Sequence, residues 1–253
     1  MLRVHGGPGA RDYAKFDYER FWLTSRAIAV ISANYRGSRG FGKKYMTLDA
    51  MQWADGIPKD VSASLAYVLD TFPIDRHRVA GMGTSFGGYM TLHLAASGTP
   101  LRCLVVDSAS TDIVKFADRR FKAYGNGSDI LQRVGDSRIP EQLAAMQAMS
   151  PSSHVAQLAS LPVLHFHGGR DDITFKDDND GFVAAMLKAN PRYTHVEMPS
   201  ERHGLLGAHA QYREISEAFL GQCLGVGTEA TGDEARKAWT PYRISGNTGF
   251  LKP

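Results

Sequence analysis

The stretch of sequence that decides the fold is RVAGMGTSFGGYM, residues 78–90. Its first half is apolar and short, which is typical of a buried strand, and its second half is typical of the start of an apolar helix. Between them, Gly83-Thr84-Ser85-Phe86-Gly87 fits the pattern G-x-S-x-G. In this pattern a strand turns sharply into a helix, and the strained turn exposes the hydroxyl of the serine. The segment therefore predicts a nucleophilic Ser85; the alternative is a glycine-rich turn with a bystander serine.

A serine hydroxyl is a useful nucleophile only when a base takes its proton and a carboxylate orients that base. On a fold with this turn, the chain order is serine, acid, histidine. Asp171 follows a predicted strand at once, and His203 lies in the loop after the next predicted strand. The order and placement predict a triad of Ser85, Asp171 and His203, with Asp172 as the alternative acid.

Outward from this stretch, apolar runs alternate with helical patterns, which indicates a mostly parallel sheet with helices on both faces. The predicted strands are residues 27–33, 78–82, 101–106, 162–166 and 193–198. The predicted helices are residues 60–69, 86–96, 140–149, 182–190 and 211–220. Segment 108–137 has no clean period and is interpreted as an insertion.

Composition narrows the class of protein. The chain has 253 residues, 43% of them hydrophobic, and a formal net charge of +3. This composition excludes wholesale disorder, and neither a nucleic-acid partner nor a membrane is indicated. No apolar stretch approaches the roughly 20 residues of a membrane helix. Cys103 and Cys223 lie far apart without zinc-ligand spacing, so we expect unpaired thiols rather than a disulfide scaffold.

Other chemistry is weighed and set aside. His165 and His167 alternate on a predicted strand near several aspartates, but an acidic helix start explains residues 177–180 more simply than a metal site. A phosphate-loop pattern at residues 37–43 fails because Lys44 stands where a Ser or Thr is required. The dinucleotide fingerprint fails because Phe86 occupies the place of its third glycine. We therefore expect no metal and no cofactor.

With these motifs in place, the sequence resembles the catalytic α/β-hydrolase domain of the prolyl oligopeptidase family of serine peptidases. Its acylaminoacyl-peptidase and dipeptidyl-peptidase branches are the most similar. The resemblance covers roughly residues 4–222. It rests on His5-Gly6-Gly7-Pro8, Asn34-Tyr35-Arg36-Gly37-Ser38 with Gly40-Phe41-Gly42, the turn at 83–90, His167-Gly168 with Asp171-Asp172, and His203-Gly204.

The resemblance implies a role for each matching residue. Ser85 would be the nucleophile, Asp171 the acid and His203 the general base of a two-step acyl transfer. The backbone N–H of Phe86 and a glycine amide, of Gly7 or Gly6, would form the oxyanion hole. Relatives normally carry a β-propeller before this domain, and we expect none in a chain of this length.

These observations lead to three hypotheses about function. The first is a serine hydrolase that cleaves short or N-blocked peptides through an acyl-enzyme. The second keeps the triad but makes the chain a carboxylesterase for small esters, and the third is a non-catalytic binding module. The aromatic residues expected to line a substrate pocket, or simply to pack the insertion, are Phe86, Phe116, Phe121 and Tyr124.

The ends of the chain carry separate expectations. Residues 1–224 are interpreted as the catalytic domain, whose leading edge is missing because the chain opens inside what resembles an oxyanion loop. Residues 225–253 are rich in Gly, Thr and charge and are expected to form an extended tail. Trp239, Tyr242 and Phe250 suggest that this tail packs on a second subunit of a homo-oligomer. Without a signal peptide in the chain, a cytoplasmic location is expected.

Overall fold

The computed structural model describes residues 1–125, 129–227 and 236–251, and its centre is one twisted sheet. Within these residues the sheet has seven strands in the order β2-β1-β3-β4-β5-β6-β7. The first six are parallel and β7 is antiparallel to β6. The strands are β1 (Leu2–Val4), β2 (Ile31–Ser32), β3 (Ala80–Thr84), β4 (Cys103–Asp107), β5 (Val163–Gly168), β6 (Tyr193–Met198) and β7 (Arg243–Gly246). The predicted mostly parallel sheet is confirmed.

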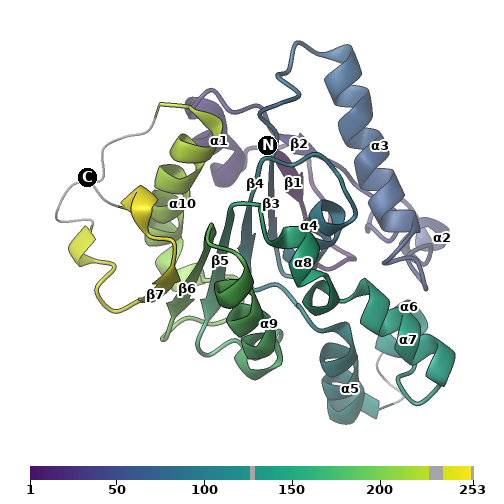
Figure 1. Ribbon diagram of the computed structural model, residues 1–253. Helices are drawn as coiled ribbons and strands as arrows, with labels where there is room; N and C mark the ends of the chain where they lie inside the picture. Colours follow the sequence, from purple (N-terminus) through teal and green to yellow (C-terminus); the bar gives the residue numbers. More distant parts are fainter. Residues whose placement is uncertain (126–128, 228–235, 252–253) are drawn as a thin grey trace.

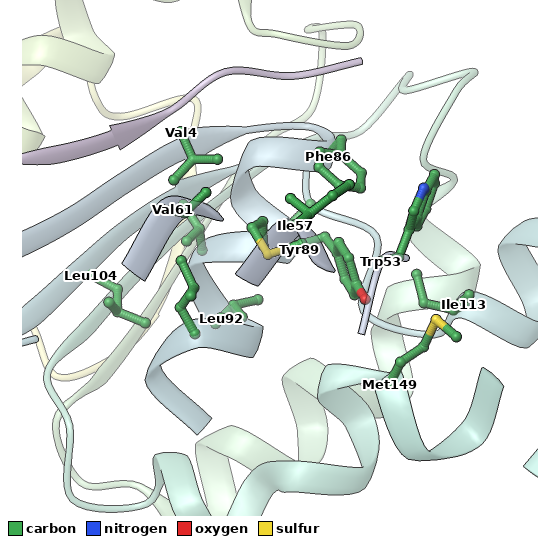
Figure 2. Close-up of a cluster of buried hydrophobic side chains, with 14 of the residues drawn as sticks. Val4, Trp53, Ile57, Val61, Phe86, Tyr89, Leu92, Leu104, Ile113 and Met149 are labelled. Carbon is green, nitrogen blue, oxygen red and sulfur yellow. The ribbon is translucent and has the colours of Figure 1, made fainter. Parts of the chain in front are cut away.

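Helices cover both faces of this sheet, as predicted (Figure 1). One face carries α3 (Gly56–Thr71), α4 (Phe86–Ala96), α8 (Val155–Leu158) and α9 (Lys176–Ala189). The other carries α1 (Tyr18–Ser25) and α10 (His209–Leu224). Successive strand residues point to opposite faces, so Leu104 and Val106 join the first core and Cys103 and Val105 the second. Figure 2 shows the first core, with α4 side chains packed between the sheet and α3.

The remaining helices lie beside the sheet. They are α2 (Lys43–Met46), α5 (Ile113–Tyr124), α6 (Ile130–Val134) and α7 (Pro140–Met149). The segment predicted as an insertion thus contains α5 and α6, which group with α7 at one side of the molecule (Figure 1). The hydrophobic periodicity of the sequence did not predict α5, because only two of its residues, Ile113 and Ala117, are buried. The rest of the helix is rich in aromatic and basic residues, which obscure an apolar face.

Among the predicted strands, residues 27–33 differ most from the structure. Only Ile31–Ser32 forms a strand, paired with β1 alone at the edge of the sheet. Ala27 has a φ of 57°, which is outside extended backbone and ends any strand there. Residues 193–198, 86–96 and 140–149 have the bounds that were predicted for them.

The two cysteines form a disulfide, so the expectation of unpaired thiols is wrong. Cys103 begins β4 and Cys223 lies in the last turn of α10, with 6.5 Å between their Cα atoms. Because α10 packs across the sheet over β4, it brings together two residues 120 positions apart, which spacing alone could not reveal. Disulfides are rare in reducing compartments, so the bridge does not favour the predicted cytoplasmic location.

The C-terminal segment is not a loose tail over its described part, residues 236–251. Its strand β7 pairs with β6, and Trp239 and Phe250 are buried in the core under α10. The Phe250 ring lies 5.3 Å from that of Phe219, and the Trp239 indole donates a hydrogen bond to Glu214. Two of the aromatic residues that suggested subunit contact are therefore already covered by the chain's own helix. None of the helices in the described residues is long and apolar enough to span a bilayer.

Candidate active site

The turn that carries Ser85 has the geometry that its sequence predicts. β3 ends at Thr84 and α4 begins at Phe86, so Ser85 alone makes the turn, with φ 60° and ψ −125°. A positive φ is strained for a residue with a side chain. A Cβ on Gly83 would overlap the carbonyl of Gly87, and a Cβ on Gly87 would overlap that of Val4. Glycine at both positions lets the backbone close around the serine.

His203 and Asp171 are joined by a hydrogen bond. The Nδ1 atom of His203 lies 3.0 Å from Oδ1 and 2.9 Å from Oδ2 of Asp171. The backbone N–H groups of Ile173 and Thr174 also donate to Asp171, each at 2.9 Å. Burial alone would raise the pKa of Asp171, but these hydrogen bonds and the His203 charge hold it below its ordinary value. The carboxylate is therefore ionised at neutral pH.

The neighbouring Asp172, the alternative acid of the sequence analysis, makes a different contact. Its carboxylate is half exposed and pairs with Arg202 at 3.0 Å. By contrast, the Asp171 side chain is inaccessible to solvent and faces His203. The structure thus places the first aspartate of the pair, and not the second, next to the histidine.

The end of β4 ties the serine turn to the histidine loop. The N–H of Ser85 donates to the carbonyl of Asp107 at 2.8 Å. The N–H of Gly204 donates to the hydroxyl of the next residue, Ser108, at 3.1 Å. The three segments follow β3, β4 and β6, which are parallel strands of one sheet, so they meet at one edge of the sheet. Among the described residues no hydrogen bond joins the Ser85 hydroxyl to His203, and in unliganded enzymes this bond is often long and tightens on binding.

Backbone amides suited to an oxyanion lie beside Ser85. The N–H of Phe86 is the first of α4 and so has no acceptor within the helix. The loop after β1 passes the serine so closely that a Cβ on Gly6 would lie 3.4 Å from the Cβ of Ser85. Gly7 follows with a φ of +123°, which favours glycine. Phe86 and Gly6 thus lie beside the serine, and Gly7 is the next residue of the same loop.

Sequence reasoning assigned no role to Tyr35 and Ser38, which hold this loop. The hydroxyl of Tyr35 donates to the carbonyl of His5 at 2.7 Å, and its ring stacks on the His5 ring at 4.3 Å. The Ser38 hydroxyl lies 3.0 Å from Nε2 of the same histidine. Their only signal in the sequence was the family motif at 34–38, which gave no hint of a contact with His5.

Sequence reasoning also missed Asp107, a buried acid at the end of β4. Its side chain accepts a hydrogen bond from the Ser108 hydroxyl at 2.7 Å and is 3% exposed. Burial raises its pKa to about 7, although the Ser108 and Thr84 hydroxyls and the charge of His203 oppose this rise. The signal was an aspartate ending an apolar strand, CLVVD.

Replacing Asp107 by asparagine is expected to stabilise the protein above pH 7. The folded-state pKa of about 7 exceeds the value of about 3.9 in an unfolded chain. The folded state therefore binds more protons in this window, and wild type loses stability as pH rises through it. Asparagine keeps an acceptor for Ser108 and cannot ionise. Urea unfolding should give the variant an advantage of about 2–4 kcal/mol at pH 8 that shrinks towards pH 4; parallel pH profiles would contradict the assignment.

A cavity of about 570 Å³ opens beside the glycine loop. Its lining comes from three places: the loop at residues 7–10, the segment from Arg39 to Trp53, and the helices α5 and α6 with the turn before α6. The side chains that line it are Arg39, Met46, Trp53, Phe116, Arg120, Asp129, Ile130 and Arg133.

Of the four aromatic residues predicted to line a pocket, Phe116 alone lines this cavity. Phe86 is 5% exposed, and its ring packs 4.6 Å from Trp53 within the core (Figure 2). Phe121 lies under the Arg138 guanidinium, and Tyr124 is 61% exposed. The Phe86 ring is enclosed by the rings of Trp53, Tyr35 and Tyr89, which keep it out of the cavity.

His165 and His167, the residues of the rejected metal site, are both buried in the sheet. The Nδ1 atom of His165 lies 2.7 Å from the Tyr193 hydroxyl, and Nε2 of His167 lies 3.8 Å from Asp171. The described part of the chain contains no group of three or more His, Cys, Asp or Glu side chains placed to hold a metal.

Comparison with known proteins adds to this geometry. A model of the prolyl oligopeptidase family matches residues 14–227. The chain is 32% identical to "Dipeptidyl peptidase family member 6" of Caenorhabditis elegans, over 90% of this chain and 32% of that protein. It is 30% identical to dipeptidyl aminopeptidase BIII of Pseudoxanthomonas mexicana, over 92% of this chain and 34% of that protein. The chain thus spans about a third of the length of these curated relatives.

Solved structures agree with the fold. A puromycin-hydrolyzing peptidase of Mycobacterium tuberculosis superposes with a TM-score of 0.81 and 28% identity, over 90% of this chain and 34% of that one. An acylaminoacyl peptidase of Pyrococcus horikoshii gives a TM-score of 0.78 at 18% identity, over 93% and 39% of the two chains. At that identity the second likeness concerns the fold alone, and it agrees with the predicted α/β-hydrolase arrangement.

Proposed function

This chain belongs to the prolyl oligopeptidase family, and from that premise we propose that it is a serine hydrolase that cleaves short or N-blocked peptides. One observation carries the proposal: a strained Ser85 on a strand–helix turn shares one edge of the sheet with His203, which is paired with the buried Asp171. A structural serine needs neither the positive φ nor the paired histidine. The names of the relatives, which are peptidases, favour a peptide over other acyl substrates.

The mechanism starts from the tautomer of His203. Because Asp171 accepts a hydrogen bond at Nδ1, this nitrogen carries the proton and Nε2 is left to take the proton of the Ser85 hydroxyl. The serine oxygen attacks the substrate carbonyl, whose oxygen becomes negative and accepts hydrogen bonds from the N–H groups of Phe86 and Gly7 or Gly6.

Collapse of this intermediate releases the leaving group, which takes its proton from His203, and leaves an acyl group on Ser85. Water then attacks the acyl-enzyme, with His203 again acting as base. Asp171 stays ionised throughout and stabilises the imidazolium that forms twice in each cycle. Tyr35 and Ser38 act as positioning residues, because they fix the loop that supplies the second amide.

A carboxylesterase would use the same residues, and the open cavity beside the glycine loop favours this second candidate for small acyl groups. Esters are cleaved more easily than amides, so ester turnover alone does not separate the two. The test compares a p-nitrophenyl ester with aminoacyl and acetyl-aminoacyl p-nitroanilides, together with labelling by a fluorophosphonate probe. We expect labelling and turnover of both substrate types.

Each other outcome favours a specific alternative. Labelling with ester turnover but no anilide turnover would favour the carboxylesterase. If the folded protein neither reacts with the probe nor turns over any substrate, the result would support the third hypothesis, a non-catalytic binding module.

A further inference from the structure

The cavity adjoins the two residues next to Ser85, because its lining includes Gly7, which follows Gly6, and Trp53, whose ring packs against Phe86. Ser85 follows β3, the loop with Gly6 and Gly7 follows β1, and Arg39 and Trp53 follow β2. Phe116, Arg120 and Arg133 come from α5 and α6, which follow β4, and the ion pair of Arg133 with Asp49 joins α6 to the segment after β2. His203 follows β6, on the other side of β3 in the sheet order. The leaving group must reach His203 for its proton, so the acyl part of a substrate extends the opposite way, towards this cavity.

Three arginines line the cavity, and they differ in how their charges are balanced. Arg133 pairs with Asp129 at 2.8 Å and also with the buried Asp49. Arg39 and Arg120 have no carboxylate within ion-pair distance anywhere in residues 1–125, 129–227 and 236–251. The cavity therefore carries two positive charges that no described side chain neutralises.

Arg39 and Arg120 both belong to the cavity lining, and each makes one further contact. Arg120 lies over the ring of Tyr124, with 5.0 Å from its Cζ to the ring centroid, and comes from α5 one turn after Phe116. Arg39 runs along the glycine loop, so that a Cβ on Gly9 would lie 3.4 Å from its Nε. Burial and then the charge of Arg39 lower the pKa of Arg133, so Arg39 and Arg133 are close enough to repel.

An anion in this cavity would relieve that repulsion. Guanidinium groups bind carboxylates through paired, charge-assisted hydrogen bonds that are about twice as strong as neutral ones. The apolar side chains of Met46, Trp53 and Phe116 in the same lining would pack on the aliphatic part of a ligand. The lining thus combines a short apolar wall with three arginines and one aspartate, Asp129, which is paired with Arg133. The excess of positive charge suits a side chain with a terminal carboxylate.

We propose that this cavity binds the acidic side chain of the residue on the acyl side of the scissile bond, with Arg39 and Arg120 as its specificity-determining residues. The substrates would then be peptides or acyl amino acids that are cleaved after glutamate or aspartate. This proposal rests on the proposed function, because the direction of the acyl group is taken from the roles of Ser85 and His203.

The test uses two substrates that differ only in the charge of the side chain, acetyl-Glu p-nitroanilide and acetyl-Gln p-nitroanilide. We expect kcat/KM to be about tenfold or more higher for the glutamate substrate, as a charge-assisted hydrogen bond would give. The ratio should fall at high salt, because ions screen charges at a solvent-open site. A ratio of one or below in an enzyme that labels with the probe would overturn the inference and leave the proposed function standing.

Substitutions of the two arginines test whether they cause the preference for the glutamate substrate. The Arg39→Gln and Arg120→Gln variants should each lower the Glu:Gln ratio at least about threefold, and the double variant should bring it close to one. Lys122→Gln is the matched control, because Lys122 lies two residues from Arg120 on α5 and is exposed outside the cavity. An equal loss of the ratio in Lys122→Gln would assign the preference to general surface charge and overturn the inference.

A binding measurement separates this inference from the proposed function. In Ser85→Ala, which forms no acyl-enzyme, acetyl-glutamate amide should bind about tenfold more tightly than acetyl-glutamine amide by titration calorimetry. This difference should vanish in the background of the two arginine variants. If wild type neither labels nor turns over substrate, the proposed function fails, and this binding ratio still decides: a difference supports the anion site and equal affinities overturn it.

Discussion

Replacing Ser85 by alanine is expected to abolish fluorophosphonate labelling and to lower kcat/KM for the best substrate by roughly 10⁵-fold or more. The loss is this large because no other group can form the acyl-enzyme, and only binding and the oxyanion amides remain. Alanine at a φ of 60° carries the same backbone strain as serine, and the N–H bond to Asp107 is kept. The fold should therefore survive, and circular dichroism and thermal unfolding should match wild type.

Two comparisons make this result specific to the nucleophile. Ser25→Ala serves as the matched control, with labelling and turnover expected to stay at the wild-type level. It removes an exposed hydroxyl at the end of α1 that donates to the carbonyl of Trp22 and accepts from the Arg26 side chain. Ser85→Ala combined with His203→Ala should be no less active than Ser85→Ala alone, because triad residues act as a unit. Labelling that persists in Ser85→Ala, mapped by peptide mass to another serine, would contradict the assignment.

The features that could be predicted from the sequence are those written into a short stretch of chain. Gly83, Ser85 and Gly87 are needed within five residues for a strand to turn into a helix, so one segment placed β3, the nucleophile and α4 together. Asp171 and His203 could then be located by their order along the chain, because parallel strands end at one edge of the sheet. The structure brings both residues together at that edge.

The features that could not be predicted depend on residues that meet only in the folded chain. The Cys103–Cys223 disulfide requires α10 to lie across β4, and the burial of Trp239 and Phe250 requires β7 to join β6. Arg39 and Arg120 were ordinary basic residues in the sequence. Only the cavity, which joins the segment after β2 to α5, shows that the two residues line the same space.

Changing Asp171 to asparagine is expected to lower kcat/KM by roughly 10⁴-fold at neutral pH while the protein stays folded. The backbone N–H groups of Ile173 and Thr174 both donate to Oδ1 of the side chain at position 171. In the variant the amide oxygen keeps this place as their acceptor, so the NH₂ group turns towards Nδ1 of His203. The histidine then carries its proton on Nε2 and cannot accept the proton of Ser85. The buried negative charge that stabilises the imidazolium is also lost.

The neighbouring aspartate supplies the matched control for this prediction. Asp172→Asn removes the same charge one residue away, where the carboxylate is exposed and contacts only Arg202 among the described residues, so kcat/KM should stay within about twofold of wild type. Steady-state kinetics of both variants on one anilide substrate measure the difference directly. Because the sequence alone left both aspartates as candidates, equal losses in the two variants, or a larger loss in Asp172→Asn, would mean that the acid lies elsewhere. We expect instead a large loss of kcat/KM in Asp171→Asn alone. This result would show that catalysis depends on the carboxylate of Asp171, which the backbone amides of residues 173 and 174 hold against His203.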